Sequence, residues 1–125
     1  MSFTISKQWH FSASHRLDGL PEDHPCARLH GHNYRVVIEL AAQKVDTVGF
    51  VFDYAKLDPF GRWLDAQVDH RHLNDLTVFN PTAENLAMWL GANFVQVVEL
   101  PKLVDRFKVT VCETPKTAAS WEASL

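Results

Sequence analysis

The chain is poor in cysteine, in basic residues and in long apolar segments, and each shortage excludes a class of protein. Two cysteines in 125 residues are too few for a disulfide scaffold, so we expect a cytoplasmic protein. Twelve Lys and Arg against fifteen Asp and Glu leave a net charge of −3, which argues against nucleic acids and anionic membranes as partners. No apolar run reaches the ~18 residues that a bilayer-spanning helix needs. Residues 1–17 alternate polar and apolar side chains, so we expect no signal peptide.

Histidine and tryptophan, by contrast, are well represented. The chain has seven histidines, several of them at short spacings, which indicates metal or acid/base chemistry. It also has four tryptophans, a heavy apolar load for so short a chain. We expect part of this apolar surface to be buried in a homo-oligomer.

Hydrophobic periodicity predicts one α+β domain over residues 1–125. Four segments alternate apolar and polar side chains, as half-buried strands do, and two segments carry the i, i+3, i+4 apolar stripe of an amphipathic helix. The order of elements is ββααββ, for which we expect an antiparallel four-stranded sheet with two helices. The predicted strands are 3–15, 30–44, 107–113 and a last one around 119–121, and the predicted helices follow Asp53 and Thr82, each a plausible N-cap.

The densest polar motif is Cys26-Ala-Arg-Leu-His30-Gly-His32. His30 and His32 stand at i and i+2 of a predicted strand, so they project from one face. His15 lies on the apolar side of the preceding strand, and antiparallel pairing would bring it beside them. Three neutral imidazoles suit Zn²⁺ and leave a fourth coordination position open, as in catalytic zinc sites. The alternative is that His30 and His32 are two surface histidines at the end of a strand.

The residues alone leave three interpretations of Cys26. It could be the fourth ligand of a closed, structural zinc site. It could be a free thiolate beside an open zinc, available for catalysis. It could also be an ordinary buried thiol, which is the role we assign to Cys112 in the middle of a strand.

Three other features have both a catalytic and a structural interpretation. Asp69 next to His70 could orient an imidazole that transfers protons, or the pair could belong to a solvated helix end. His70 and His72 also form a second His-x-His, which leaves a rival metal site open. Glu113 lies on the apolar side of its strand, where it could bind N–H groups of a ligand or pair with Lys or Arg. Glu84 could be a plain helix-start residue.

Six ordered motifs carry a resemblance to a known family. They are His15, His24-Pro-Cys26-Ala-Arg-Leu-His30-Gly-His32-Asn-Tyr34, Gly49-Phe-Val-Phe-Asp53-Tyr54, Asp69-His70-Arg-His-Leu-Asn74-Asp75, Asn80-Pro-Thr82-Ala-Glu84-Asn85 and Cys112-Glu113-Thr114. Over essentially its whole length the chain resembles the 6-pyruvoyl-tetrahydropterin and 6-carboxy-tetrahydropterin synthases. The resemblance implies the T-fold, a ββααββ unit that assembles through its sheets into a toroidal trimer, with two trimers stacked as a hexamer and active sites between subunits.

The same resemblance implies a role for each residue of the site. His15, His30 and His32 would ligate zinc, and Cys26 would be the catalytic thiol. Asp69 and His70 would be its acid/base partners, reaching it from a neighbouring subunit. The remaining implied residues are Glu113, which would clamp the N–H edge of the pterin, and Thr82 and Glu84, which would lie near the pterin pocket.

The family substrate implied by the resemblance is 7,8-dihydroneopterin triphosphate. One branch cleaves its side chain to give 6-carboxy-tetrahydropterin and acetaldehyde, for queuosine and other 7-deazapurines, and the chain looks closer to bacterial members of this branch. The alternative branch yields 6-pyruvoyl-tetrahydropterin for biopterin synthesis. A third branch, in folate synthesis, has Glu in place of the thiol, and Cys26 argues against it. A further alternative is a non-catalytic pterin-binding module on the same fold. Residues 114–121 depart from the family's usual C-terminal strand.

Overall fold

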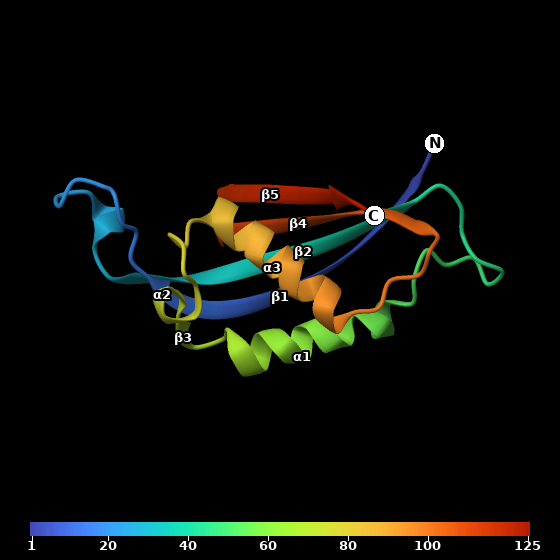
Figure 1. The fold of residues 1–125 in the computed structure, drawn as a ribbon, viewed down its shortest axis with the longest axis horizontal. Coiled ribbons are helices and arrows are strands. Elements are labelled where there is room, and N and C mark those ends of the chain that lie inside the picture. The colour runs from blue at the N-terminus through green and yellow to red at the C-terminus, as the bar shows by residue number, and fades with distance from the viewer.

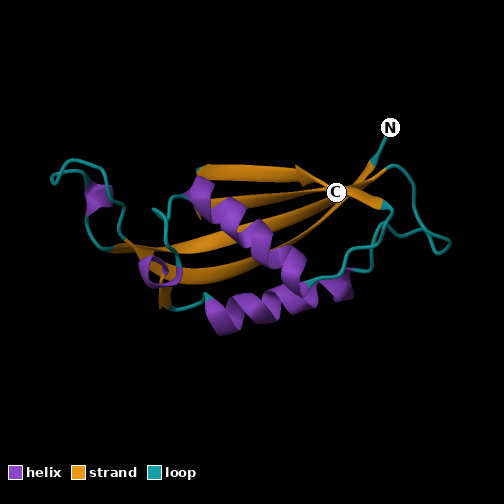
Figure 2. Ribbon diagram, in the orientation of Figure 1, coloured by secondary structure: helices purple, strands orange, loops and turns teal.

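The fold consists of one sheet with helices packed on one of its faces (Figure 1). The computed structural model describes all 125 residues. Figure 2 separates the strands from the two longer helices, which cross the sheet on the same side. The elements are β1 Phe3–His15, β2 His30–Ala42, α1 Asp58–Gln67, β3 Arg71–His72, α2 Leu73–Leu76, α3 Ala83–Val97, β4 Val104–Thr114 and β5 Thr117–Ser124, with 3₁₀ turns at Pro25–Ala27 and Tyr54–Leu57.

The four long strands confirm the predicted antiparallel sheet and the order ββααββ. The spatial order is β3-β1-β2-β4-β5, and β1 pairs with β2, β2 with β4 and β4 with β5 in antiparallel fashion. The structure adds two pieces in the segment 69–80, where we predicted only a connection. They are β3, which pairs parallel to β1 and makes the sheet mixed, and the single turn α2. Two and four residues are too short to show a hydrophobic period.

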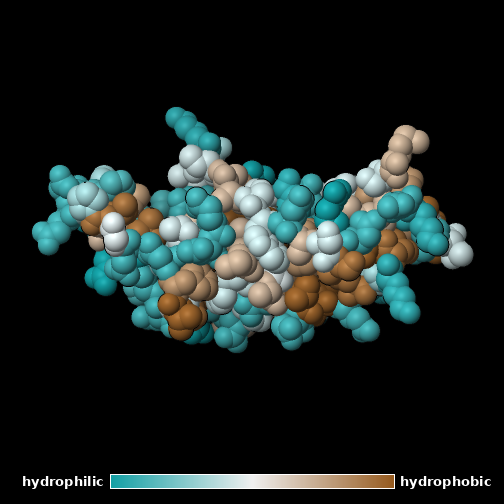
Figure 3. Space-filling view, turned by 45° about the horizontal axis from the view of Figure 1, so that its top comes forward, coloured by the Kyte–Doolittle hydropathy of each residue, from teal (hydrophilic) through white to brown (hydrophobic).

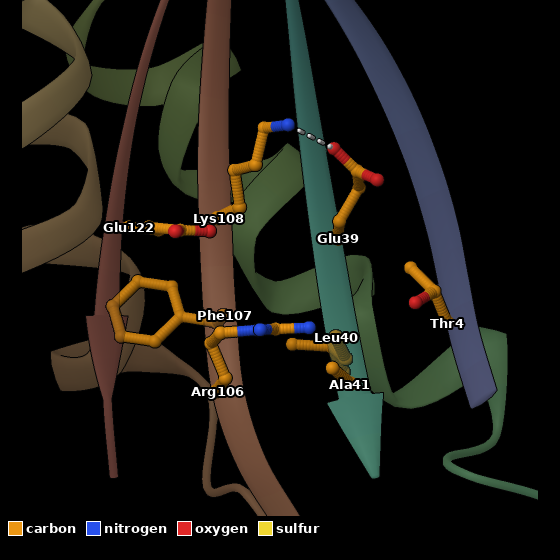
Figure 4. A pocket seen from close by; sticks show the side chains of 8 residues that line it. All are labelled: Thr4, Glu39, Leu40, Ala41, Arg106, Phe107, Lys108 and Glu122. Atoms are coloured by element: carbon orange, nitrogen blue, oxygen red, sulfur yellow. Dashed lines mark ion pairs between the residues drawn. The ribbon is translucent and has the colours of Figure 1, made fainter. Parts of the chain in front are cut away.

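The alternation of the strands separates a buried face of the sheet from an open one. Phe11 and Ala13 of β1 and the even-numbered residues of β2 from Tyr34 onward are buried under the helices. The opposite face is polar, and Figure 4 shows part of it near the start of β1. There the Lys108 ammonium lies 3.6 Å from a carboxylate oxygen of Glu39 on the neighbouring strand. Glu39 lies opposite Ser6, nine residues before His15. Because each strand residue advances about 3.3 Å, this charged pair lies ~30 Å along β1 from His15.

Both predicted helix starts are confirmed, with one difference. Asp53 accepts a hydrogen bond from the amide of Ala55 at 2.9 Å, but the turn that it caps is 3₁₀, and α1 itself begins at Asp58. Thr82 caps α3 directly, because its hydroxyl accepts a hydrogen bond from the amide of Asn85 at 3.2 Å. None of the helices combines the length with the apolar composition that crossing a membrane requires.

Two glycines let tryptophans approach the helices closely. A Cβ on Gly91 of α3 would lie 2.6 Å from the indole ring of Trp121 on β5. A Cβ on Gly61 of α1 would lie at the same distance from the indole nitrogen of Trp9 on β1. Both contacts are far inside the distance that carbon atoms tolerate. We expected part of the tryptophan surface to be buried at an oligomer interface. Some of it is instead buried against the helices of the same chain, at Trp9 and Trp121.

Candidate metal centre and active site

Three histidines meet at one end of the sheet, where β1 ends and β2 begins. The register places His15 opposite His30 and Ala13 opposite His32, so all three imidazoles project from the helix-covered face. His15 is completely buried. Their nitrogen ligand atoms lie within 4.8 Å of one another, as a group that could hold a metal ion. The predicted convergence of the three histidines is confirmed.

The hydrogen bonds around this cluster determine which nitrogens are free to ligate. Nδ1 of His15 lies 2.8 Å from the carbonyl oxygen of Pro81, and Nδ1 of His30 lies 2.7 Å from that of Arg28. A carbonyl only accepts, so both Nδ1 atoms carry the proton and both Nε2 atoms present lone pairs. These two Nε2 atoms lie 3.0 Å apart. Two lone pairs at that distance repel each other unless a cation lies between them, so the donor set fits a metal ion.

Burial keeps His15 in the form that binds metals. Removal from water lowers the pKa of His15 below its ordinary value, although the hydrogen bond to Pro81 acts in the opposite direction. The phenol of Tyr34, also fully buried, lies 3.3 Å from Nδ1 of His15. We did not predict a role for Tyr34, although it closes the motif that contains His30 and His32. Its burial raises the pKa of Tyr34, and the neighbouring Glu113 adds to the effect, so the phenol stays neutral.

Cys26 lies outside the histidine cluster. It belongs to a 3₁₀ turn in the loop between β1 and β2, is half-buried, and is not one of the residues that could share a metal with the histidines. The three-histidine group does not support the closed-site interpretation, in which Cys26 would be a fourth ligand. Cys112 is buried as expected, but on the polar face of the sheet, where a guanidinium nitrogen of Arg35 lies 3.5 Å from its sulfur.

Asp69 and His70 form a hydrogen-bonded pair against β1. One oxygen of Asp69 accepts the amide hydrogen of Ser12 at 2.8 Å, and the other lies 2.8 Å from Nδ1 of His70. These contacts, the Ser12 amide first, lower the pKa of Asp69. His70 has a φ of 60°, in the left-handed region, and its side chain is 82% exposed. The pair is therefore an ionised carboxylate that orients a solvent-accessible imidazole.

The Asp69–His70 pair does not belong to the group of histidines that could hold a metal ion. His70 and His72 line an open hollow of about 590 Å³ together with Ser12, Ser14 and His32, the last of which also belongs to the histidine cluster. Nδ1 of His72 lies 3.0 Å from the hydroxyl of Ser14, and neither histidine belongs to a group that could hold a metal. The rival His-x-His metal site is therefore not formed. No hydrogen bond joins His70 to Cys26 within the chain.

Glu113 lies beside the metal cluster, as its place on the strand suggested. Its carboxylate oxygen is 4.0 Å from Nε2 of His15, and its side chain is 25% exposed. It makes no ion pair with Lys or Arg, so the structural alternative is not found. The helix-start residues are less telling. The hydroxyl of Thr82 is engaged as the cap of α3, and Glu84 is exposed in the first turn of that helix.

Comparison with known proteins accounts for this arrangement. Residues 4–124 match the family of 6-pyruvoyl tetrahydropterin synthase. The chain belongs to this family. Among the curated relatives, the 6-carboxy-5,6,7,8-tetrahydropterin synthase of Synechocystis is 33% identical over 126 residues, covering 94% of this chain and 91% of the relative. The protein of the same name from Bacillus subtilis is 31% identical over 124 residues, covering 91% of this chain and 81% of the relative.

The solved structures support the same family and the T-fold. The 6-pyruvoyl tetrahydropterin synthase of Caenorhabditis elegans superposes with a TM-score of 0.82 and 30% identity, covering 99% of this chain and 97% of the other. The predicted membership and fold are both confirmed. Family membership and these relatives show that the chain is an enzyme, a lyase of the pterin synthase type.

Proposed function

We propose that the chain is a zinc-dependent 6-carboxy-5,6,7,8-tetrahydropterin synthase. It would convert 7,8-dihydroneopterin triphosphate and one water molecule to 6-carboxy-5,6,7,8-tetrahydropterin, acetaldehyde and triphosphate, a step toward queuosine and other 7-deazapurines in the cytoplasm. The observation that carries the proposal is the group of His15, His30 and His32, whose nitrogen ligand atoms converge beside the carboxylate of Glu113. The names of the bacterial relatives support the choice of product.

The proposal gives each site residue a chemical task. Zn²⁺ held by the three histidines would polarise the hydroxyls of the substrate side chain and make the adjacent C–H bonds more acidic. The Cys26 thiolate would remove a proton there as general base, and the Asp69–His70 pair would serve as the second proton-transfer site. Glu113 would accept hydrogen bonds from the 2-amino group and ring N–H of the pterin. Thr82 and Glu84 would lie near the pterin, at the start of α3 next to Pro81.

We also propose that the working enzyme is a homo-oligomer, a trimer or a dimer of trimers, with its active sites between subunits. The lack of a hydrogen bond between His70 and Cys26 within the chain supports this, because a second subunit could supply the missing proton-transfer pair. Both long edges of the sheet support it too. All of β5 and residues 3–12 of β1 have a strand neighbour on one side only. Apolar patches lie open on the surface between hydrophilic side chains (Figure 3).

Product analysis tests the proposed function directly. The purified, zinc-loaded protein would be incubated with 7,8-dihydroneopterin triphosphate without oxygen, and pterins and acetaldehyde would be measured by mass spectrometry. We expect 6-carboxy-tetrahydropterin together with acetaldehyde. Formation of 6-pyruvoyl-tetrahydropterin without acetaldehyde would replace the proposed reaction by that named for the C. elegans structure. Substrate binding without turnover would leave only a pterin-binding module.

A further inference from the structure

Two asparagines hold the segment that links the metal cluster to the Cys26 loop. Asn74, on α2, accepts the amide hydrogen of Arg16 at 2.9 Å and donates its own amide to the Arg16 carbonyl at 2.8 Å. Asn80 does the same for Asp18, with distances of 2.9 and 3.0 Å. Both motifs entered the resemblance, yet the proposed chemistry uses neither asparagine.

The residue between these two contacts points the other way and reaches Cys26. The amide hydrogen of Leu17 is donated to the carbonyl oxygen of Cys26 at 3.0 Å. In an extended backbone, alternate residues direct their N–H and C=O groups to opposite sides. Residues 16–18 thus act as a short strand, with two asparagine side chains along one edge and the backbone of Cys26 along the other.

A carboxamide is suited to both contacts, whereas an ionised carboxylate can only accept. The carbonyl and NH₂ groups of a carboxamide lie in one plane and reproduce the acceptor and donor of a neighbouring peptide. Both asparagines are half-buried, and the backbone carbonyl of Asn80 accepts a further hydrogen bond from Asn85 at 2.9 Å. Residues 16–29 run from one proposed ligand, His15, to the next, His30, and extend beyond the sheet at the end where α2 and β3 lie (Figure 1). Within this loop, the hydrogen bonds of residues 16–18 are the ones that connect the backbone of Cys26 to the body of the protein.

We propose that Asn74 and Asn80 are positioning residues that act through residues 16–18 to hold Cys26 in place for catalysis. The proposal rests on the function proposed above, in which Cys26 is the catalytic thiol. Replacing either asparagine by Asp keeps the size of the side chain but replaces the donor by an oxygen that faces a backbone carbonyl. The loop then loosens, while His15, His30 and His32 keep their places on the two strands.

The first test follows the thiol itself and needs no substrate. The full-length variants Asn74→Asp and Asn80→Asp are treated with iodoacetamide, and alkylation of Cys26 is followed by peptide mass spectrometry. The hydrogen bonds of Asn74 and Asn80 to residues 16–18 are called the asparagine clamp. Loss of this clamp exposes the thiol more often, so the alkylation rate should rise about five-fold or more in each variant. Asn93→Asp is the matched control, because the Asn93 amide donates only to Trp89 within α3. Rates within about two-fold of wild type in both variants, with the control unchanged, would overturn the proposal.

The second test asks whether the effect on turnover passes through Cys26. Asn74→Asp should lower kcat about ten-fold with little change in KM or zinc content. Combined with Cys26→Ala, the same substitution should lower the residual kcat less than about two-fold, because the group that it positions is already gone. Equal losses in both backgrounds would overturn the proposal. If the variants are alkylated faster but the wild-type protein shows no turnover, the proposed function is refuted. The conclusion that the asparagine clamp positions Cys26 then still stands.

If the variants do not fold, hydrogen exchange of backbone amides in the wild-type protein tests whether residues 16–18 are held in place. Each amide of residues 16–18 donates to a named partner, so we expect at least ~100-fold protection from hydrogen exchange. Exchange of these amides at the rate of a free peptide would show that the asparagine clamp does not hold the loop, and would overturn the proposal.

Discussion

Zinc should stabilise the folded chain strongly, and the loss of one histidine should remove most of that effect. Three neutral imidazoles with two Nε2 atoms 3.0 Å apart form a site in the folded state that the unfolded chain lacks. At a free zinc concentration near 1,000 times Kd, this linkage adds ~4 kcal/mol to the free energy of unfolding. For a chain of this size, 1 kcal/mol corresponds to roughly 3–5 °C in Tm, so the expected rise is roughly 12–20 °C.

The measurement is the Tm of the metal-stripped protein, alone and with added zinc, together with the zinc content after gel filtration. His30→Ala removes one of the two facing nitrogens and should reduce the zinc-dependent rise to less than ~5 °C. His10→Ala is the matched control, because His10 lies exposed on the polar face of β1 and should leave the rise intact. A His30→Ala protein that kept one zinc per chain and the full rise would refute the reasoning.

Four further predictions follow from the same structure. Cys26→Ala should retain zinc and lose all but a small residual turnover, measured by metal content and product formation; release of the metal would make Cys26 a ligand. Glu113→Gln should lower kcat/KM about 10–100-fold in a steady-state assay, because charge-assisted hydrogen bonds of ~1.5–3 kcal/mol are weakened; an unchanged value would remove Glu113 from the pterin site. Gly91→Ala should destabilise the fold by about 1–3 kcal/mol in chemical denaturation, because its Cβ would overlap the ring of Trp121. Burial lowers the pKa of His15 below the ordinary 6.5, so the unfolded chain binds that proton more readily. The metal-free protein should therefore lose stability as the pH falls below about 6.5, and His15→Gln should make that loss less steep.

The alternation of apolar side chains was enough to predict the main strands and the meeting of the three histidines. His15 shares the parity of Phe11 and Ala13, so its burial on the same face follows from the period of two. The carbonyls of Pro81 and Arg28 that fix the tautomers were not predictable, because every residue has a carbonyl and no sequence signal marks these two.

The placement of polar groups relative to the sheet was harder to predict. The segment that carries Asp69 and His70 runs along the edge of β1, held by hydrogen bonds to the backbone of Ser12, and such contacts leave no periodic pattern. The alternation that puts Glu113 on the apolar side of its strand also puts Cys112 on the polar side, but its contact with Arg35 has no sequence signal. Cys112 is buried like an apolar residue, although it faces the polar side.

The close contact between Gly91 and Trp121 also acts as a stop that sets where α3 lies along the sheet. If the helix slid by one turn, the residue facing the indole would become Ala87 or Val95, and either Cβ would collide with the ring. Of these three longitudinal positions, only the observed one is free of collision. Thr82 lies nine residues from Gly91, ~14 Å along the axis, and Pro81 precedes it. A steric contact without any chemistry of its own thus sets the distance at which the carbonyl of Pro81 meets His15.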